Sequence, residues 1–579
     1  MPQESRLPAR LALAGLVTVV VVSPWPFGAV RPTALLTLTV ACLLAAGVAL
    51  VTGWVQGGLL RPSLPLWPLL GFVGLGLGQL VPLPASIHAF VSPGSSAVWH
   101  PAEDAAAAVL GTGAHPISLD PDTTLRVVAL VAGLSLLGWL AAPALARSGP
   151  AIPGVALVAA SGFCLSAYAI YARARFGSLL YGQLVVPTIR PFGSFVSKNH
   201  FAGYVEMAAL LAAGLALGLV ERERARGRDW TTGPRAGGVI AAIVSSVAMA
   251  LAVLACLSRG GVISLGAGVL AFLGLLLVRP TDSRPRRGFV AALGLAAGLG
   301  VLLLALVPPE AQERMRSLGG ASFRLDTWRD SVRMACTSPL VGQGLGAFHD
   351  AYPRFKHGHG LIRVEHAEND YLETLAEGGL VGLGLALAGA ALLLLGRRGA
   401  ARVEPAVRGI GIGALGGLVA LGVHSTVDFN LRIPSNAALA ALLAGAVAGA
   451  AGVSARPLSR KASAALALGL VALSASLWAA PRSRVLEARE EGRRAAEAPT
   501  PEARLLRLER SEAGLVGVLK RRPAHAESWL MLAGVRAAVG DVRTSAGLAR
   551  HALFLDPERP GLREAAERLA GEGQGRGSP

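Results

Sequence analysis

The stretch 363–379 reads Arg-Val-Glu-His-Ala-Glu-Asn-Asp-Tyr-Leu-Glu-Thr-Leu-Ala-Glu-Gly-Gly, and an apolar run follows it. Polar residues at helical spacing occur at His366, Asn369, Asp370, Glu373 and Glu377. On a helix, this spacing places them on one face. A polar face at the entrance to a membrane span usually lines a pathway or a reaction site, because polar groups are costly in lipid. The alternative is a solvated helix end whose acids favour the positive N-terminal dipole.

Similar apolar runs recur along the chain. Of its 579 residues, 53% are hydrophobic and only 16% are charged. Runs of about 20 apolar residues have the length that a helix needs to cross about 30 Å of hydrocarbon. We therefore predict an all-α, polytopic integral membrane protein. The thirteen predicted spans are 11–22, 33–53, 64–84, 124–146, 152–172, 200–220, 237–257, 260–278, 289–307, 379–396, 409–425, 437–453 and 463–481.

The first apolar run has two interpretations. Arg6 and Arg10 precede it, as in a signal peptide, but the Ser23-Pro-Trp-Pro-Phe27 that follows lacks a small-residue cleavage site. Because another span comes next, we predict a retained first helix. The four cysteines are scattered, which indicates neither a disulfide framework nor a zinc site.

Basic residues determine the predicted orientation. They concentrate in alternate connections between spans, whereas the connection 85–122, of opposite parity, contains neither Lys nor Arg. By the positive-inside rule the N-terminus is then cytoplasmic, and thirteen crossings place the C-terminus outside. This topology explains the net charge of +18, so we expect no nucleic-acid partner.

Four polar clusters that are distant in sequence fall on the outer side in this topology. They are 190–200, with Arg190 and Asn199; the turn Ser258-Arg259-Gly260-Gly261; the connection 308–370; and the stretch from His424 through Asp428 to Asn430. Chance places one or two such clusters on one face more readily than four. We therefore expect them to share a site.

The clusters supply arginines and a histidine, with no convincing set of metal ligands. Guanidinium groups bind pyrophosphate through bidentate, charge-assisted hydrogen bonds, and a histidine can accept a proton from an attacking hydroxyl. Together they suit a transfer in which a lipid pyrophosphate leaves, without metal or other cofactor. Asp120-Pro121-Asp122 looks like an acid-x-acid metal motif, but a turn that caps the next helix explains it at least as well. His357-Gly-His359 indicates a surface loop.

Several short motifs follow one another within residues 150–450. They are Arg190-x-Phe-Gly-Ser-Phe with Asn199-x-Phe-Ala-Gly-Tyr204, Ser258-Arg-Gly-Gly261, Arg324-x-x-x-Trp328, Pro339-Leu-x-Gly-x-Gly-x-Gly-x-Phe348 and His366-x-x-Asn-x-Tyr-Leu372. Each is loose alone, but the ordered set resembles the O-antigen ligase and O-antigen polymerase family of bacterial membrane glycosyltransferases.

The resemblance implies an all-helical membrane fold with a large outer loop between two late spans, here 308–370. It also implies an inner-membrane enzyme of polysaccharide biosynthesis that moves glycan from undecaprenyl pyrophosphate to an acceptor hydroxyl. In ligases the acceptor is the lipid A core of lipopolysaccharide, and in polymerases it is another lipid-linked repeat unit. Transfer to protein hydroxyls remains open, because the same chemistry would serve.

Carried over by position, the resemblance assigns Arg190 and Arg324 to the donor's pyrophosphate and makes His366 the base for the acceptor hydroxyl. Arg259 is expected to assist at the pyrophosphate. Supporting or sugar-binding roles are expected for Asn369, Glu373 and Asp428.

Each assignment has an alternative. Arg190 and Arg259 could be interfacial arginines that contact lipid headgroups, and Arg324 with Trp328 could belong to an amphipathic helix on the membrane. His424 is interpreted as a packing histidine. The glycines of the fourth motif indicate an irregular loop, since no strand precedes them.

After Pro481 the sequence becomes charged and rich in Ala, Leu and Arg. Between Pro523 and Pro560, several residues fall near tetratricopeptide-repeat positions: Trp529, Leu532, Gly540, Ala552 and Pro557. We predict a transmembrane domain over 1–481, a periplasmic tetratricopeptide-like domain over 482–571 and a disordered tail over 572–579. Binding of a periplasmic protein partner and a simple helical cap are both open.

Two rival functions come from other classes. A transporter or flippase of lipid-linked glycan needs polar residues deep in several spans, whereas here they gather at one face. A scaffold that recruits envelope proteins through its C-terminal segment leaves the arginines and the histidine without a role. We therefore expect a glycosyltransferase.

Overall fold

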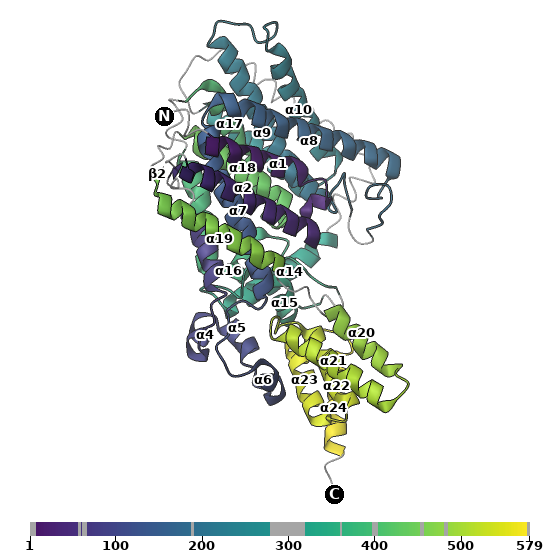
Figure 1. Ribbon diagram of the computed structural model, residues 1–579. Helices are drawn as coiled ribbons and strands as arrows, with labels where there is room; N and C mark the ends of the chain where they lie inside the picture. Colours follow the sequence, from purple (N-terminus) through teal and green to yellow (C-terminus); the bar gives the residue numbers. More distant parts are fainter. Residues whose placement is uncertain are drawn as a thin grey trace. The chain divides into compact units, whose positions relative to one another are not determined.

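The computed structural model describes residues 7–55, 59–60, 67–186, 190–277, 319–358, 362–396, 403–451, 457–479 and 485–575. The chain divides into two compact units (Figure 1). The first comprises Met1–Leu70, Ala129–Ser317 and Ala386–Trp478, and the second comprises Gly71–Val128, Leu318–Leu385 and Ala479–Pro579. Three helices contribute several residues to both: α3 (Trp67–Gly78), α7 (Pro121–Leu145) and α16 (Asp370–Gly396). A fourth, α19 (Arg460–Ala479), contributes only its last residue, Ala479, to the second unit.

The rest of the first unit is a helical bundle. Its helices are α1 (Leu7–Val22), η2 (Phe27–Ala29), α2 (Pro32–Val55), α8 (Ser148–Phe176), α9 (Lys198–Arg224), α10 (Ala236–Ala255), α11 (Arg259–Leu277), α17 (Pro405–His424), η6 (Asn430–Arg432), α18 (Pro434–Ala450) and α19 (Arg460–Ala479). Among the described residues, strands are limited to β1 (Leu59–Leu60), which pairs antiparallel with β2 (Pro457–Leu458).

Helix α9 forms the centre of this bundle. Its most apolar stretch is entirely buried, and α8, α10, α11, α17 and α18 all contact it. A Cβ atom added at Gly214 would lie 2.4 Å from the carbonyl oxygen of Gly409 on α17. Glycine is therefore required for the two backbones to approach this closely, as is common between helices in lipid.

Twelve of the thirteen predicted spans coincide with apolar helices in the described part of the chain. Eight of these helices are long and apolar enough to cross a membrane, and α1, α3, α18 and α19 are shorter. The all-α, polytopic membrane fold is thus confirmed. The count of thirteen stays a prediction, and the span at 289–307 lies outside the described residues.

The second unit combines three separate parts of the sequence around one hydrophobic core. Its other helices are α4 (Ala85–Val91), α5 (Pro93–Trp99), α6 (Asp104–Leu110), α14 (Gly319–Thr337), α15 (Phe348–Ala351), η4 (Tyr352–Phe355), α20 (Val485–Ala496), α21 (Pro501–Leu519), α22 (Ala526–Ala538), α23 (Val542–Leu555) and α24 (Leu562–Gly575). Trp99, Phe348 and Trp529, one from each part, are buried in this core.

The C-terminal helices α20 to α24 contact one another in sequence order within this unit. The hairpin of α22 and α23 lies where the tetratricopeptide unit is predicted, with Trp529 and Ala552 buried. Its helical form agrees with the prediction. Its assignment as a tetratricopeptide repeat and the domain boundaries at 481 and 571 stay predictions.

Of the five polar residues that would share one face of a helix, Asp370, Glu373 and Glu377 lie on α16, whereas His366 and Asn369 precede it. Helix α16 begins at Asp370, and Asn369 caps it by accepting hydrogen bonds from the backbone N–H groups of Tyr371 and Leu372. Because the asparagine side chain accepts these hydrogen bonds in place of a preceding backbone carbonyl, the helix begins at Asp370 and does not extend back to His366. At the other end of the stretch 363–379, Gly379 lies inside α16, where its φ of 63° interrupts the helical geometry.

Candidate functional site

In the first unit, basic side chains gather around Lys198. The Lys198 ammonium donates a hydrogen bond to the carbonyl oxygen of Leu257 at 2.5 Å. The guanidinium charges of Arg190, Arg259 and Arg173 all act on this ammonium. Within the described part of the chain, Arg173, Arg190 and Lys198 form no salt bridge. Like charges held together in this way favour an anionic ligand.

A small cleft opens beside this cation cluster. Its lining residues are Ala172, Arg173, Gly177, Leu179, Pro191, Phe192 and Gly193. The Arg190 side chain is exposed, and its backbone carbonyl accepts a hydrogen bond from the N–H of Lys198 at 2.9 Å. That bond ties the loop before α9 to the first residue of the helix.

A polar network follows directly in the sequence of α9. The Asn199 amide donates to Asp428 at 2.7 Å and accepts from the Ser258 hydroxyl at 2.8 Å. His200 lies 3.3 Å from the other oxygen of Asp428. Burial opposes ionisation of Asp428, but the hydrogen bond and positive charge of His200 outweigh it and lower the pKa of this carboxyl. Asp428 is therefore an ionised anchor that orients Asn199 and His200.

His424 is a satisfied packing histidine, as its sequence context indicates. Its Nδ1 lies 3.1 Å from Glu206, which also accepts a hydrogen bond of 2.6 Å from the Ser264 hydroxyl. The side chains of His424 and Glu206 are both fully buried. Sequence reasoning missed Glu206, which carries a carboxylate inside an otherwise apolar helix.

In the second unit, the segment before α16 carries the histidine. His366 Nδ1 lies 2.9 Å from Glu373 Oε1, while the other Glu373 oxygen accepts from the N–H of Ala367 at 2.8 Å. His366 is one-third exposed, whereas Glu373 is buried. With Nδ1–H donated to the carboxylate, Nε2 is the ring nitrogen with the lone pair, which is the arrangement of a general base.

Arg324 lies beside the same segment. Its Nε and one terminal nitrogen both lie 3.3 Å from a single oxygen of Glu368. On the next turn of α14, the Trp328 indole donates to the backbone carbonyl of Glu368 at 3.3 Å. Glu368, two residues after His366, therefore connects Arg324 to the segment that holds the histidine.

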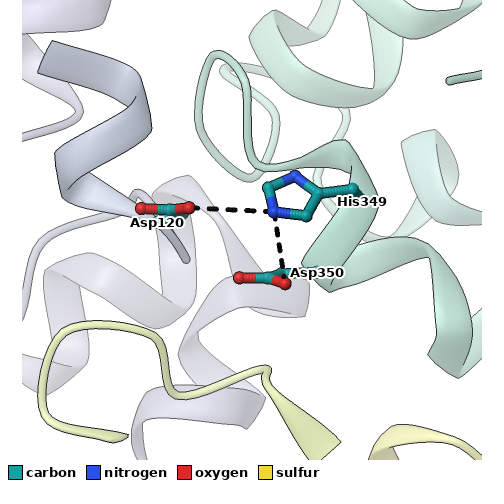
Figure 2. A group of neighbouring side chains, drawn as sticks. All are labelled: Asp120, His349 and Asp350. Atoms are coloured by element: carbon teal, nitrogen blue, oxygen red, sulfur yellow. Dashed lines mark ion pairs between the residues drawn. The ribbon is translucent and has the colours of Figure 1, made fainter. Parts of the chain in front are cut away.

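A cluster of two aspartates and one histidine lies elsewhere in the second unit. Ligand atoms of Asp120, His349 and Asp350 lie within 4.8 Å of one another (Figure 2). Arg522 fills the same place, with two hydrogen bonds of 2.7 Å to Asp350 and a 3.0 Å contact to His349. The next residue back, Arg521, pairs with Asp122. A guanidinium group thus supplies the positive charge that a metal ion would bring.

The Asp120-Pro121-Asp122 turn caps α7. Asp120 accepts hydrogen bonds from the backbone N–H of Thr123 at 3.1 Å and from its hydroxyl at 2.7 Å. The helix-capping interpretation of this motif is therefore confirmed. Burial, together with the charge of Asp350, raises the pKa of Asp120. Burial opposes ionisation of Asp350 as well, but His349 and Arg522 outweigh it and lower its pKa.

The predicted site residues thus divide between the two units. Arg190, Arg259 and Asp428 lie in the first, and Arg324, His366, Asn369 and Glu373 lie in the second. A site shared by all of them stays a prediction. Sequence reasoning missed Lys198, Arg173 and His200. The polar triplet Lys198-Asn199-His200 at the start of an apolar span was the available signal for two of them.

This architecture defines a polytopic helical membrane protein with ionisable side chains clustered at the ends of its helices. Residues 244–387 match the family described as O-antigen ligase. Among curated proteins, none matches the sequence significantly. This match supports a membrane protein of the glycan-transferase kind in general.

Proposed function

We propose that the protein transfers glycan from undecaprenyl pyrophosphate to an acceptor hydroxyl at the outer face of the inner membrane. The observation that carries this proposal is the cation cluster around Lys198. Its members Arg173, Arg190 and Lys198 have no acidic partner among the described residues, so a diphosphate would supply the missing negative charge. Donors placed where charge develops stabilise a leaving group strongly.

Arg324 is the donor ligand that we assign in the second unit. Its two hydrogen bonds to Glu368 are long, at 3.3 Å, and share one carboxylate oxygen. A phosphate offers a guanidinium two oxygens at once, so it would compete well for this side chain. Arg259, in the first unit, is assigned to the donor's diphosphate together with Arg190.

His366 is the base in this proposal. Its Nε2 takes the proton from the acceptor hydroxyl, whose oxygen forms a bond to the anomeric carbon of the donor glycan. The bond from that carbon to the phosphate oxygen breaks, and undecaprenyl pyrophosphate leaves with the bonding electrons. Glu373 orients the imidazole and stabilises its protonated form. Asn369 holds the start of α16, and Asp428 orients Asn199 and His200.

The test uses purified protein in liposomes with a lipid-linked glycan donor and a soluble acceptor. We expect transfer in the wild type and a loss of about 10²–10⁴-fold in His366→Ala, since general bases contribute that much. Tyr371→Phe, in the first turn of α16, is the matched control. Full activity in His366→Ala at normal membrane abundance would show that the base is wrongly assigned.

A transporter of lipid-linked glycan is the second candidate. The buried Glu206, His424 and Ser264 favour it, because they place polar groups inside spans. Movement of the donor between leaflets without glycosylation of any acceptor would identify a transporter. In cells lacking the protein, single-unit glycan indicates a polymerase, and intact polymer on its carrier indicates a ligase. If those cells lose glycan from their proteins but keep normal polysaccharide, the enzyme is a protein glycosyltransferase.

A further inference from the structure

Three histidines of the connection 85–122 meet in the second unit. His88 lies in the last turn of α4, and His100 directly follows α5. His115 is held by its backbone, which pairs antiparallel with Leu83. The ring centroids of His88 and His100 lie 5.7 Å apart, and those of His100 and His115 lie 5.1 Å apart.

Hydrogen bonds determine the tautomer of two of these rings. Ser95 donates its hydroxyl proton to the carbonyl of Ile117 at 2.5 Å, so its oxygen accepts from His88 Nε2–H at 3.1 Å. His115 Nε2 lies 3.2 Å from the carbonyl of Gly111, which also requires a proton on that nitrogen. In both rings, Nδ1 therefore carries the lone pair.

The lone pair of His88 is buried without a hydrogen bond. His88 is fully buried, and its Nδ1 has no hydrogen-bond partner among the described residues. Nε2 of His100 is also a buried atom without a hydrogen-bond partner among the described residues. Buried polar nitrogens are rarely left unsatisfied in proteins. Histidines that bind metals show this pattern, in which one ring N–H donates to a protein oxygen while the other nitrogen faces the ion.

The spacing of the His100 ring from each of the other two rings suits one small ion. Zinc–nitrogen bonds measure about 2.0–2.1 Å, and tetrahedral bond angles then place the ring centres about 5 Å apart. The three ligand nitrogens do not all lie within 4.8 Å of one another. Binding therefore requires at least one ring to turn about its Cβ–Cγ bond.

We propose that His88, His100 and His115 bind one divalent transition-metal ion such as Zn²⁺. Imidazole nitrogens select zinc, copper or nickel over Mg²⁺ and Ca²⁺, which require oxygen ligands. No Lys or Arg occurs in 85–122 to repel the cation. The ion would cross-link α4, α5 and the pairing of Leu83 with His115, and its fourth position would hold water.

The experiment measures Zn²⁺ binding to the full-length protein in nanodiscs, without a histidine tag, by competition with a chromophoric chelator. The expected stoichiometry is one ion per chain. His100→Gln and His115→Gln should each weaken binding at least about tenfold. His357→Gln, which removes an exposed histidine from another part of the same unit, should bind like the wild type.

Two results would overturn the proposal: the absence of Zn²⁺ binding in the wild type, or unchanged binding in both variants. Unchanged binding in both variants would also be the result if Asp120, His349 and Asp350 held the ion instead. Co²⁺ provides a check that needs no variant, because tetrahedral coordination gives it an intense visible spectrum. If the wild type loaded with Co²⁺ lacks that spectrum, the three-histidine site is wrong.

Discussion

Arginines gather in two regions of this protein, and their surroundings differ. In the cation cluster of the first unit, Arg173 and Arg190 are exposed and have no acidic partner in the described chain. In the second unit, the Arg522 side chain is 18% exposed and binds Asp350 through two hydrogen bonds. Arginines without an acidic partner in the described part of the chain can bind an anionic ligand, as at Arg173 and Arg190. An arginine with such a partner cross-links the fold, as at Arg522.

This difference has energetic consequences. Like charges around Lys198 repel one another, and a bound diphosphate would relieve that repulsion. At Arg522, two desolvated charges already compensate each other, so breaking the pair costs more than forming it contributes. Substitutions in the first region should therefore change substrate binding and transfer. Those in the second should change the attachment of the C-terminal helices.

Between these two regions, the largest effect is expected for Arg190→Ala. Loss of one preorganised cation at the leaving group should reduce glycan transfer by about 10²–10³-fold. Arg175→Ala removes another exposed arginine, which stacks on Phe176 and is absent from the charges around Lys198. Initial rates with purified donor should be near wild type for that control. Equal losses in both variants would mean that Arg190 contributes only general surface charge.

Asp350→Asn should have a large effect of another kind. It leaves the half-buried Arg522 without its bidentate partner, at a cost of about 3 kcal/mol or more. We expect faster proteolytic release of the C-terminal helices from the full-length protein. Glu103→Gln breaks the exposed pair with Arg550, which should cost about 0–1 kcal/mol. Release at the same rate in both variants would remove the distinction between the two pairs.

The apolar runs predict the membrane helices well, because length and composition alone determine which segments cross lipid. The start of α16 is harder, because the Asn369 cap is a choice between competing local hydrogen bonds. The role of Arg522 could not be predicted at all, since its partner Asp350 lies 172 residues away in sequence. An arginine in a charged helical segment normally indicates only a solvated surface.

Arg324 tests whether an arginine with an acidic partner can still bind substrate. If it binds the donor, Arg324→Ala should reduce transfer about tenfold more than Glu368→Gln, because the first removes a charge at the leaving group and the second frees it. If Arg324 only supports the Glu368 segment, both variants should lose the same activity. Rates at saturating and limiting donor separate these outcomes, since a lost donor contact raises KM or lowers kcat in Arg324→Ala alone.

The smallest effect concerns pH and the two buried aspartates. The pKa of Asp350 is lowered, so its contribution to stability is present above the usual aspartate pKa and is lost as the pH falls through its folded value. The pKa of Asp120 is raised, so its contribution is present below the usual value and is lost as the pH rises through its folded value. The two contributions oppose each other, and the wild type should respond only weakly to acid.

Asp120→Asn separates the two contributions, because asparagine still caps α7 but no longer titrates. In this variant the pH-dependent stability from Asp350 remains, and the opposing contribution from Asp120 is absent. The urea midpoint of the full-length protein should therefore rise more steeply with pH through the acid range than in the wild type. An unchanged slope would show that the titration of Asp120 does not oppose that of Asp350, and that the acid response of the second region depends on Asp350 alone.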